Sequence, residues 1–316
     1  MNPLNRRSFL QYSAAAVTGM ALSPTLSFGS NAERKFKVSL NPGAIGVKST
    51  QKELIGHAVR HNFEAISPMP EQLGKMTSGE LSEFLGEMKE HKLSWDAAGL
   101  PVDFRKDQAT FNEGLAELPK IAQICQKSGV TRMSTWVMPS HDNLTYHQNF
   151  KQHQTRLKQA AQILKDYGIR FGFEYVGTKK LKISNRYPFV GTMKEMLELI
   201  DAVDVAGVGL QLDAYHWYTS TETVADLEAL KNEQIITCDL NDATAGRTIA
   251  EQIDGERQLP GDSGLIDLKG FMGALVKIGY DGAVRAEPFN AKLNAMENEE
   301  ALEATSKAMW RTVNLV

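Results

Sequence analysis

This chain of 316 residues has only two cysteines, Cys125 and Cys238, without the paired spacing of a zinc motif. Each falls in an apolar segment, Cys125 in a predicted helix and Cys238 in a predicted strand. We therefore expect two small core residues and no disulfide. A fold held together by disulfides or by cysteine-bound zinc is not expected.

An excess of charge of one sign is also missing. Lys and Arg number 35 against 38 Asp and Glu, which gives a net charge of -3. A nucleic-acid or anionic-membrane surface needs a strongly basic balance, so we expect neither kind of partner. Hydrophobic residues make up 42% of the chain, enough for a full core, and no segment is of low complexity.

The chain has no apolar run long enough to span a membrane. Its most apolar N-terminal stretch, from Tyr12 to about Phe28, is too short and too rich in Ser, Thr and Gly, so stable membrane insertion is not expected. Paired arginines, Arg6 and Arg7, followed by Phe9-Leu10 stand just before it, and the whole segment resembles a twin-arginine export signal. We interpret residues 1–32 as this signal and expect a periplasmic protein. The alternative is a short buried helix.

No Gly-rich phosphate-binding motif follows the first predicted strand, and no linker or second-domain boundary appears, which disfavours a doubly wound sheet. Residues 33–316 instead alternate apolar strands with helices of 3.6-residue periodicity, in eight units over about 280 residues. This pattern predicts one α/β domain, a (β/α)8 TIM barrel. Its strands are expected at 36–40, 63–68, 93–100, 131–137, 169–176, 208–213, 234–240 and 283–287.

Acidic residues end the last four predicted strands: Glu174, Asp213, Asp239 and Glu287. Parallel barrel strands place their C-terminal ends at one rim, which is where such enzymes keep their functional groups. Close carboxylates repel one another strongly in a poorly solvated pocket. A divalent cation is the simplest way to keep them ionised and close, so we expect these four residues to be metal ligands.

Three further residues are candidates for contacts with a substrate. His216 follows Asp213 by three residues, so we expect it on the loop past the strand. It could ligate the metal or contact a substrate hydroxyl, and we prefer the second role. Trp217 beside it could stack on a sugar face, with wall packing as the alternative. Arg257 lies in a long segment rich in turn-forming residues, 241–263, and loops of this length in a compact barrel are often functional.

Several short motifs together give the chain a family resemblance. They are Phe173-Glu174-Tyr175-Val176-Gly177, Leu212-Asp213-Ala214-Tyr215-His216, Leu240-Asn241-Asp242-Ala243, Arg257-Gln258-Leu259-Pro260-Gly261, and Gly279-Tyr280-Asp281-Gly282 followed by Glu287-Pro288-Phe289. In this order and spacing the chain resembles the sugar isomerase/epimerase superfamily with a xylose isomerase-like barrel, in particular its keto-sugar 3-epimerase branch.

The resemblance implies a role for each candidate residue. In that branch the acids of strands five, six and eight and a histidine of strand seven bind one divalent metal. Carried over, Glu174, Asp213 and Glu287 match as ligands, the two glutamates also move the proton, and His216 and Arg257 hold substrate oxygens. The strand-seven histidine is replaced by Asp239. An all-oxygen site favours Mn or Mg, with Co or Zn as further candidates.

The sequence therefore predicts a metal-dependent isomerase or epimerase of carbohydrate metabolism that removes a proton next to a sugar carbonyl through an enediolate. A lyase or hydrolase of 3-keto-glycosides would use the same metal and carboxylates. A periplasmic sugar-binding protein without activity is a third reading, suggested by Asp239. An abasic-site endonuclease shares the barrel but normally has more histidine ligands and a basic face. The expected partner is a small sugar or glycoside, and a homo-oligomer stays open.

Overall fold

The protein is described here from a computed structural model that covers residues 33–316, and the predicted export segment lies outside the described residues. A nine-stranded parallel sheet forms its centre, in the order β3-β2-β1-β11-β10-β9-β7-β5-β4. The strands are β1 (Lys37–Leu40), β2 (Ala65–Ile66), β3 (Ser94–Trp95), β4 (Ala98–Gly99), β5 (Arg132–Val137), β7 (Arg170–Tyr175), β9 (Val208–Asp213), β10 (Ile235–Leu240) and β11 (Ala283–Ala286).

The sheet closes into a barrel because its two end strands are halves of one segment. β3 pairs with β2 and β4 pairs with β5, while only Asp96 and Ala97 separate β3 from β4 along the chain. The Asp96 carboxylate accepts the backbone N–H of Ala97 at 2.6 Å. This local bond interrupts the single strand predicted over 93–100. The (β/α)8 TIM barrel is otherwise confirmed, strand for strand.

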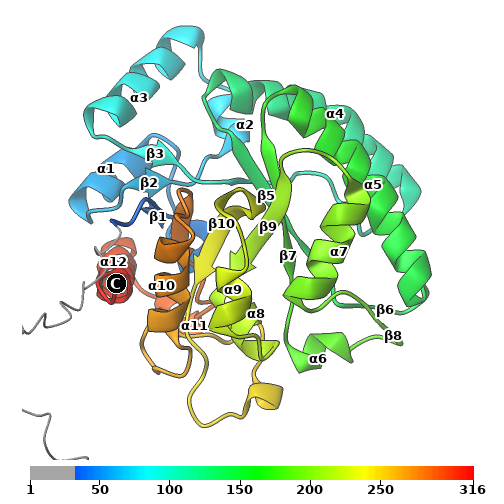
Figure 1. Ribbon diagram of the computed structural model, residues 1–316. Helices are drawn as coiled ribbons and strands as arrows, with labels where there is room; N and C mark the ends of the chain where they lie inside the picture. Colours follow the sequence, from blue (N-terminus) through cyan, green and yellow to red (C-terminus); the bar gives the residue numbers. More distant parts are fainter. Residues whose placement is uncertain (1–32) are drawn as a thin grey trace, which may run out of the picture. The chain divides into compact units, whose positions relative to one another are not determined.

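Helices surround the barrel (Figure 1). The larger ones are α1 (Glu53–Arg60), α3 (Ser78–Glu90), α4 (Gln108–Lys127), α5 (Tyr146–Asp166), α7 (Met193–Val203), α10 (Leu268–Lys277) and α12 (Asn298–Val313). Side chains cap the starts of α3, α4, α7 and α10. The Thr77 hydroxyl accepts the backbone N–H of Glu80, whose side chain bonds back to Thr77. None of the helices within residues 33–316 is long and apolar enough to cross a membrane.

Short elements add to the barrel, all but one of them where the sequence predicts only loops. They are the helices α2 (Pro70–Leu73), α6 (Lys179–Lys182), α8 (Ala214–Thr219), α9 (Val224–Glu228) and α11 (Ala291–Asn294), the 3-10 turns η1 (Gly43–Ile45), η2 (Asn232–Gln234) and η3 (Ile249–Glu251), and the strands β6 (Ser140–His141) and β8 (Tyr187–Pro188). Of these, only α9 is predicted, as a short helix over 225–230. β6 and β8 form a separate antiparallel ribbon.

The core fills the barrel and the space beneath the helices. β10 is buried at every residue and β9 at all but its first, because a parallel barrel strand meets the interior on one face and helices on the other. Cys125 and Cys238 are free and fully buried, which confirms them as small core residues. Acidic side chains within this apolar frame therefore require specific partners.

Candidate active site

The acidic residues predicted at the strand ends meet at one rim of the barrel. Glu174 lies on β7, Asp213 ends β9, Asp239 lies on β10 and Glu287 directly follows β11. Asp213 and Asp239 are fully buried, and Glu174 is 6% exposed. The parallel strands turn these ends to the same side, as the sequence predicts.

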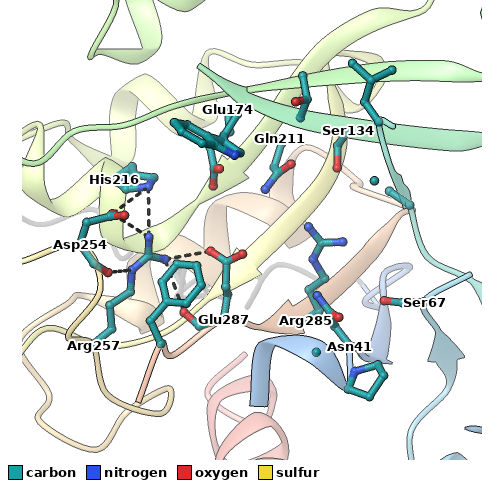
Figure 2. A pocket seen from close by; sticks show the side chains of 18 of the residues that line it. Asn41, Ser67, Ser134, Glu174, Gln211, His216, Asp254, Arg257, Arg285 and Glu287 are labelled. Carbon is teal, nitrogen blue, oxygen red and sulfur yellow. Dashed lines mark hydrogen bonds and ion pairs between the residues drawn. The ribbon is translucent and has the colours of Figure 1, made fainter. Parts of the chain in front are cut away.

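A cavity of about 770 Å³ opens above this rim (Figure 2). We call it the main cavity. Its volume lies in the range of small-molecule sites, about 300–1,000 Å³. Glu174 and Glu287 point into it from opposite sides in the close-up view. The other polar side chains that line it are Asn41, Ser67, Arg105, Ser134, Thr135, Gln211, His216, Asp254, Arg257 and Arg285.

Arg257 bridges two of the acids. Its Nη1 donates to Asp213 Oδ2 at 2.7 Å and to Glu287 Oε2 at 3.0 Å, and Nη2 donates to Asp254 Oδ1 at 2.8 Å. The guanidinium also lies 4.5 Å from the ring centre of Phe289, whose φ of 38° is a strained left-handed conformation. Arg257 also lines the main cavity. Its contact with a substrate remains a prediction.

The loop that carries Arg257 is organised by Asp242, which the sequence analysis does not single out. Its carboxylate accepts the backbone N–H groups of Ala243, Ser263, Gly264 and Ile266 at 2.7–3.1 Å. These bonds fasten both ends of the loop predicted over 241–263. Four donors on one buried carboxylate fix the shape of the loop. The loop in turn fixes the position of Arg257.

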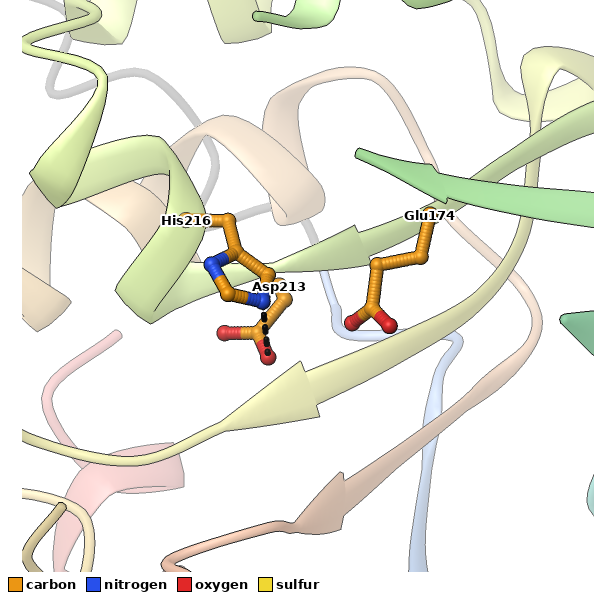
Figure 3. Close-up of side chains that lie close together, drawn as sticks. All are labelled: Glu174, Asp213 and His216. Carbon is orange, nitrogen blue, oxygen red and sulfur yellow. Dashed lines mark ion pairs between the residues drawn. The ribbon is translucent and has the colours of Figure 1, made fainter. Parts of the chain in front are cut away.

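His216 lies on the short helix α8 and not in the predicted loop. Asp213 caps this helix by accepting the backbone N–H of Tyr215 at 2.6 Å, so the helix starts at once after β9. His216 Nδ1 accepts the backbone N–H of Gly177 at 3.2 Å. Burial lowers the pKa of His216 to about 4, so the ring is neutral at pH 7. Its Nε2 faces the rim, 3.9 Å from Asp213 Oδ2 and 3.3 Å from Arg257 Nη2, a nitrogen that can only donate (Figure 3).

His216 has two candidate roles, as a metal ligand or as a contact to a substrate oxygen. The lone pair on Nδ1 is taken by Gly177, so only Nε2 can serve either role. Nε2 has the donor Nη2 of Arg257 on one side and carboxylate oxygens of Asp213 and Asp254 on the other, so it can act as acceptor or as donor. Both roles stay predictions, and the substrate contact is the one the sequence analysis prefers.

We predict that Gly177→Ala displaces His216 and lowers the free energy of unfolding by about 1–3 kcal/mol. A Cβ at Gly177 would lie 2.5 Å from the backbone oxygen of His216 and 2.5 Å from Ser220 Oγ, too close for either atom to remain in place. Urea denaturation measures the loss. Gly86→Ala is the matched control, because nothing lies within 4 Å of that added Cβ. Equal stability of the two variants would contradict the prediction.

Asp239 already has partners on both of its oxygens. Arg285 donates to Oδ1 at 2.6 Å and to Oδ2 at 3.2 Å, and Gln211 donates to Oδ2 at 2.9 Å. Arg285 also reaches the buried Asp96 at 3.4 Å. A carboxylate has further lone pairs, so the metal-ligand role of Asp239 stays a prediction. The ion pair nevertheless explains why an acid is stable at this position of β10.

The sequence analysis misses Arg285, although a signal for it exists. Arg285 stands two residues before Glu287, and residues two apart on a strand share one face. The register pairs Asp239 with Arg285 on the neighbouring strands β10 and β11. An arginine on the inner face of a barrel strand, beside an acid at the same level, could have been recognised as its partner.

Trp217 does not lie where its predicted role requires. It is 5% exposed, packs against the ring of Phe271 at 5.5 Å and donates its indole N–H to the Thr223 carbonyl. It is not among the residues that line the main cavity, so its position does not support substrate stacking. The aromatic residues that do line the cavity are Trp136 and Phe289.

The electrostatics of the rim suit a cation. Burial, reinforced by Glu287, raises the pKa of Glu174 well above its ordinary range, and burial with the charge of Asp239 does the same for Glu287. Asp213 differs, because Arg257 and hydrogen bonds from Asn241 and the Tyr215 backbone outweigh burial and hold its pKa below the usual value. Within residues 33–316, Oε1 of Glu174 is buried without a hydrogen-bond partner.

Two overlapping groups among the described residues could hold a metal ion. Glu174, Asp213 and His216 form one, and Glu174, Asp239 and Glu287 form the other, with donor atoms within 4.8 Å of one another in each group. His216 can join the first group only through Nε2, because Nδ1 accepts the backbone N–H of Gly177. All other candidate ligand atoms in the two groups are carboxylate oxygens, so the residues present fit a hard divalent cation.

Fold and site together define a (β/α)8 barrel with a buried acidic cluster under a sugar-sized cavity. The chain belongs to the xylose isomerase-like TIM barrel family, whose model matches residues 55–312.

Known proteins similar to this chain include sugar isomerases and epimerases. An inosose isomerase from Bacillus velezensis is 22% identical over 282 residues, which cover 86% of this chain and 96% of that protein. The solved structure of an IOLI protein with a bound zinc atom has a TM-score of 0.72 at 22% identity and covers 88% of this chain and 98% of its own. D-psicose 3-epimerase from Clostridium cellulolyticum H10 has a TM-score of 0.63 at 13% identity, covering 85% and 94%.

Proposed function

We propose that the protein is a divalent-metal-dependent isomerase or epimerase that moves a proton next to the carbonyl of a sugar. One observation carries the proposal: Glu174 and Glu287 both line the main cavity, and a carboxylate oxygen of each lies within 4.8 Å of the other and of Asp239. Two carboxylates that flank one reacting carbon can remove a proton from it and return one from the other side. The inosose isomerase similarity supports this reaction class.

The other residues of the rim hold the substrate in this proposal. Nε2 of His216 faces the rim and contacts a substrate oxygen. Arg257 lies beside it with its N–H groups on Asp213, Glu287, Asp254 and His216, so its contact with a substrate oxygen shares donors with these partners. Together they orient the carbonyl and the neighbouring hydroxyl towards the glutamates. Trp136 and Phe289 supply apolar walls of the main cavity and exclude water from the reacting carbon.

A divalent metal would be held by Glu174, Asp213 and Glu287, with Asp239 as the fourth candidate ligand. Such an ion acts as a Lewis acid that stabilises negative charge developing on oxygen. Burial and mutual repulsion disfavour the charged form of Glu174 and Glu287, and a cation compensates both effects. Oxygen ligands favour Mn or Mg.

We predict that chelation removes both the metal and the activity. Dialysis against EDTA should reduce turnover of a ketose to background, and added Mn or Mg should restore it. Metal binding to the folded state alone should also raise the free energy of unfolding by about 2.7 kcal/mol at a metal concentration one hundred times Kd. Metal analysis of the purified protein provides the second readout. A protein purified without metal that gains no stability from Mn, Mg, Co or Zn would contradict the metal site.

The reaction itself is tested by incubating the protein and Mn with free ketoses and with 3-keto-glycosides in deuterated water. An isomerase or epimerase gives a rearranged sugar that carries solvent deuterium at the exchanged carbon. A lyase or hydrolase instead releases the aglycone. If neither product forms although the protein retains its metal, a sugar-binding protein without activity becomes the better interpretation.

A further inference from the structure

A second hollow of about 310 Å³ adjoins the main cavity and is not used by the proposed chemistry. We call it the side hollow. It is lined by Ser140, His141, Asp142, Asn143, Asn149, His153 and Asn185, together with Arg105, Trp136 and Met138. The last three also line the main cavity, so the two spaces share one wall. The two spaces are therefore adjacent, with these three side chains between them.

The shared wall is rigid and amphipathic. The Arg105 guanidinium lies between two aromatic rings, 4.4 Å from the centre of Phe104 and 4.1 Å from that of Trp136. It donates to Thr135 Oγ1 at 3.0 Å and to the Trp136 carbonyl at 2.7 Å. Trp136 is nevertheless 44% exposed. An open indole with donors beside it suits the apolar face and hydroxyl edge of a sugar ring.

Two buried side chains of α5 line the side hollow with unused acceptors. Asn149 is 1% exposed and His153 is 4% exposed. His153 Nδ1 lies 2.9 Å from the backbone carbonyl oxygen of Asn149. That oxygen can only accept, so Nδ1 carries the hydrogen and Nε2 is a free acceptor. Within residues 33–316, neither His153 Nε2 nor Asn149 Oδ1 has a hydrogen-bond partner.

These unused acceptors identify the chemistry of a ligand. A buried polar atom without a partner costs about 1–3 kcal/mol, so its presence in a native protein calls for an explanation. Acceptors are satisfied by O–H or N–H donors, and a sugar ring presents several hydroxyls. The lining holds one carboxylate, Asp142, and one guanidinium, Arg105, so these two charges balance and favour no ionic ligand. The preferred occupant is thus neutral and hydroxylated.

We propose that the side hollow binds the second sugar ring of a glycoside whose keto-sugar ring occupies the main cavity. This inference rests on the proposed function for the placement of the first ring. It narrows the substrate class from free monosaccharides to two-ring glycosides, with Asn149, His153 and Trp136 as residues that determine specificity.

The test compares matched one-ring and two-ring ligands by calorimetry. Probes are D-fructose with lactulose, and methyl 3-keto-α-glucoside with 3-keto-trehalose. We expect at least one disaccharide to bind about tenfold more tightly than its one-ring partner, because two otherwise unpaired acceptors gain donors. Equal affinity within both pairs, or no binding of either disaccharide, would overturn the proposal and indicate a hollow filled by water only.

Substitutions then locate the effect in the side hollow. Asn149→Leu keeps the branched shape and removes the amide, and it should lower disaccharide affinity about tenfold while changing one-ring affinity less than twofold. Asn143→Trp, at the exposed rim, should give the same loss by filling the hollow, even if Asn149→Leu fails to fold. Gln152→Leu, on the same helix but outside this lining, should change neither affinity. Equal losses for both ligand sizes in Asn149→Leu and Asn143→Trp would reject the subsite.

Failure of this inference is distinguishable from failure of the proposed function. The affinities need no turnover, so a disaccharide preference without isomerisation would reject the proposed function and leave the side hollow as a sugar subsite. Isomerisation of free ketoses without any disaccharide preference would support the proposed function and reject the sugar subsite in the side hollow.

Discussion

Glu287→Gln is expected to lower kcat by about 10²–10⁴-fold, the usual contribution of a positioned acid–base group. The amide keeps the shape of the side chain and can still accept the hydrogen bond that Arg257 donates to Glu287 at 3.0 Å. It cannot take up a proton from carbon. The rim should therefore keep its geometry and most of its metal affinity, because Glu174 and Asp213 remain.

Steady-state kinetics with the ketose identified as substrate, together with metal titration, measure the two effects separately. Glu300→Gln provides the control, since that side chain is exposed on α12 and does not line the main cavity. Turnover near the level of the unmodified protein would reject the role of Glu287 in proton transfer. A loss of turnover that excess Mn restores would instead make Glu287 only a ligand.

Arg285→Met is expected to lower the free energy of unfolding by about 3–5 kcal/mol, the loss typical of removing one partner from a buried ion pair. Arg285 is 7% exposed, and its guanidinium is the cation that contacts both Asp239 and Asp96. Methionine fills a similar volume but leaves two buried carboxylates without that compensation. Asp96 retains bonds from Ser39 and Thr237, so Asp239 bears most of the loss.

Urea denaturation with EDTA present measures this loss without a contribution from bound metal. The double variant Arg285→Met with Asp239→Asn should recover most of the stability, because the second substitution removes the uncompensated charge. Arg60→Met is the matched control: it breaks an exposed pair with Glu299 and should cost about 0–1 kcal/mol. A loss below about 1 kcal/mol in Arg285→Met would show that the pair does not stabilise the barrel.

The same ion pair bears on the metal. If Asp239 pairs with Arg285 and does not bind the metal, Asp239→Asn should leave the metal content of the protein unchanged. If it is the fourth ligand, the substitution should weaken metal binding. The two carboxylate oxygens already accept three hydrogen bonds, and this geometry makes the first outcome our expectation.

The sequence by itself determined the barrel and the end of it that carries the acids. Strands buried on both faces need continuous apolar residues, helices need a 3.6-residue period, and both patterns are local, so they can be read without coordinates. Parallel strands turn all their C-terminal ends to one rim, which is why Glu174, Asp213, Asp239 and Glu287 could be expected together.

Only the tertiary structure decided what each acid contacts. Asp239 pairs with Arg285 through the register of β10 and β11, Arg257 bridges Asp213 and Glu287 from a distant loop, and Trp217 turns into the core beside Phe271. The side hollow, too, arises where α5 meets the loops after β5 and β7. Such contacts join residues far apart in the chain and depend on strand register, loop path and side-chain packing, none of which a local pattern of residues encodes.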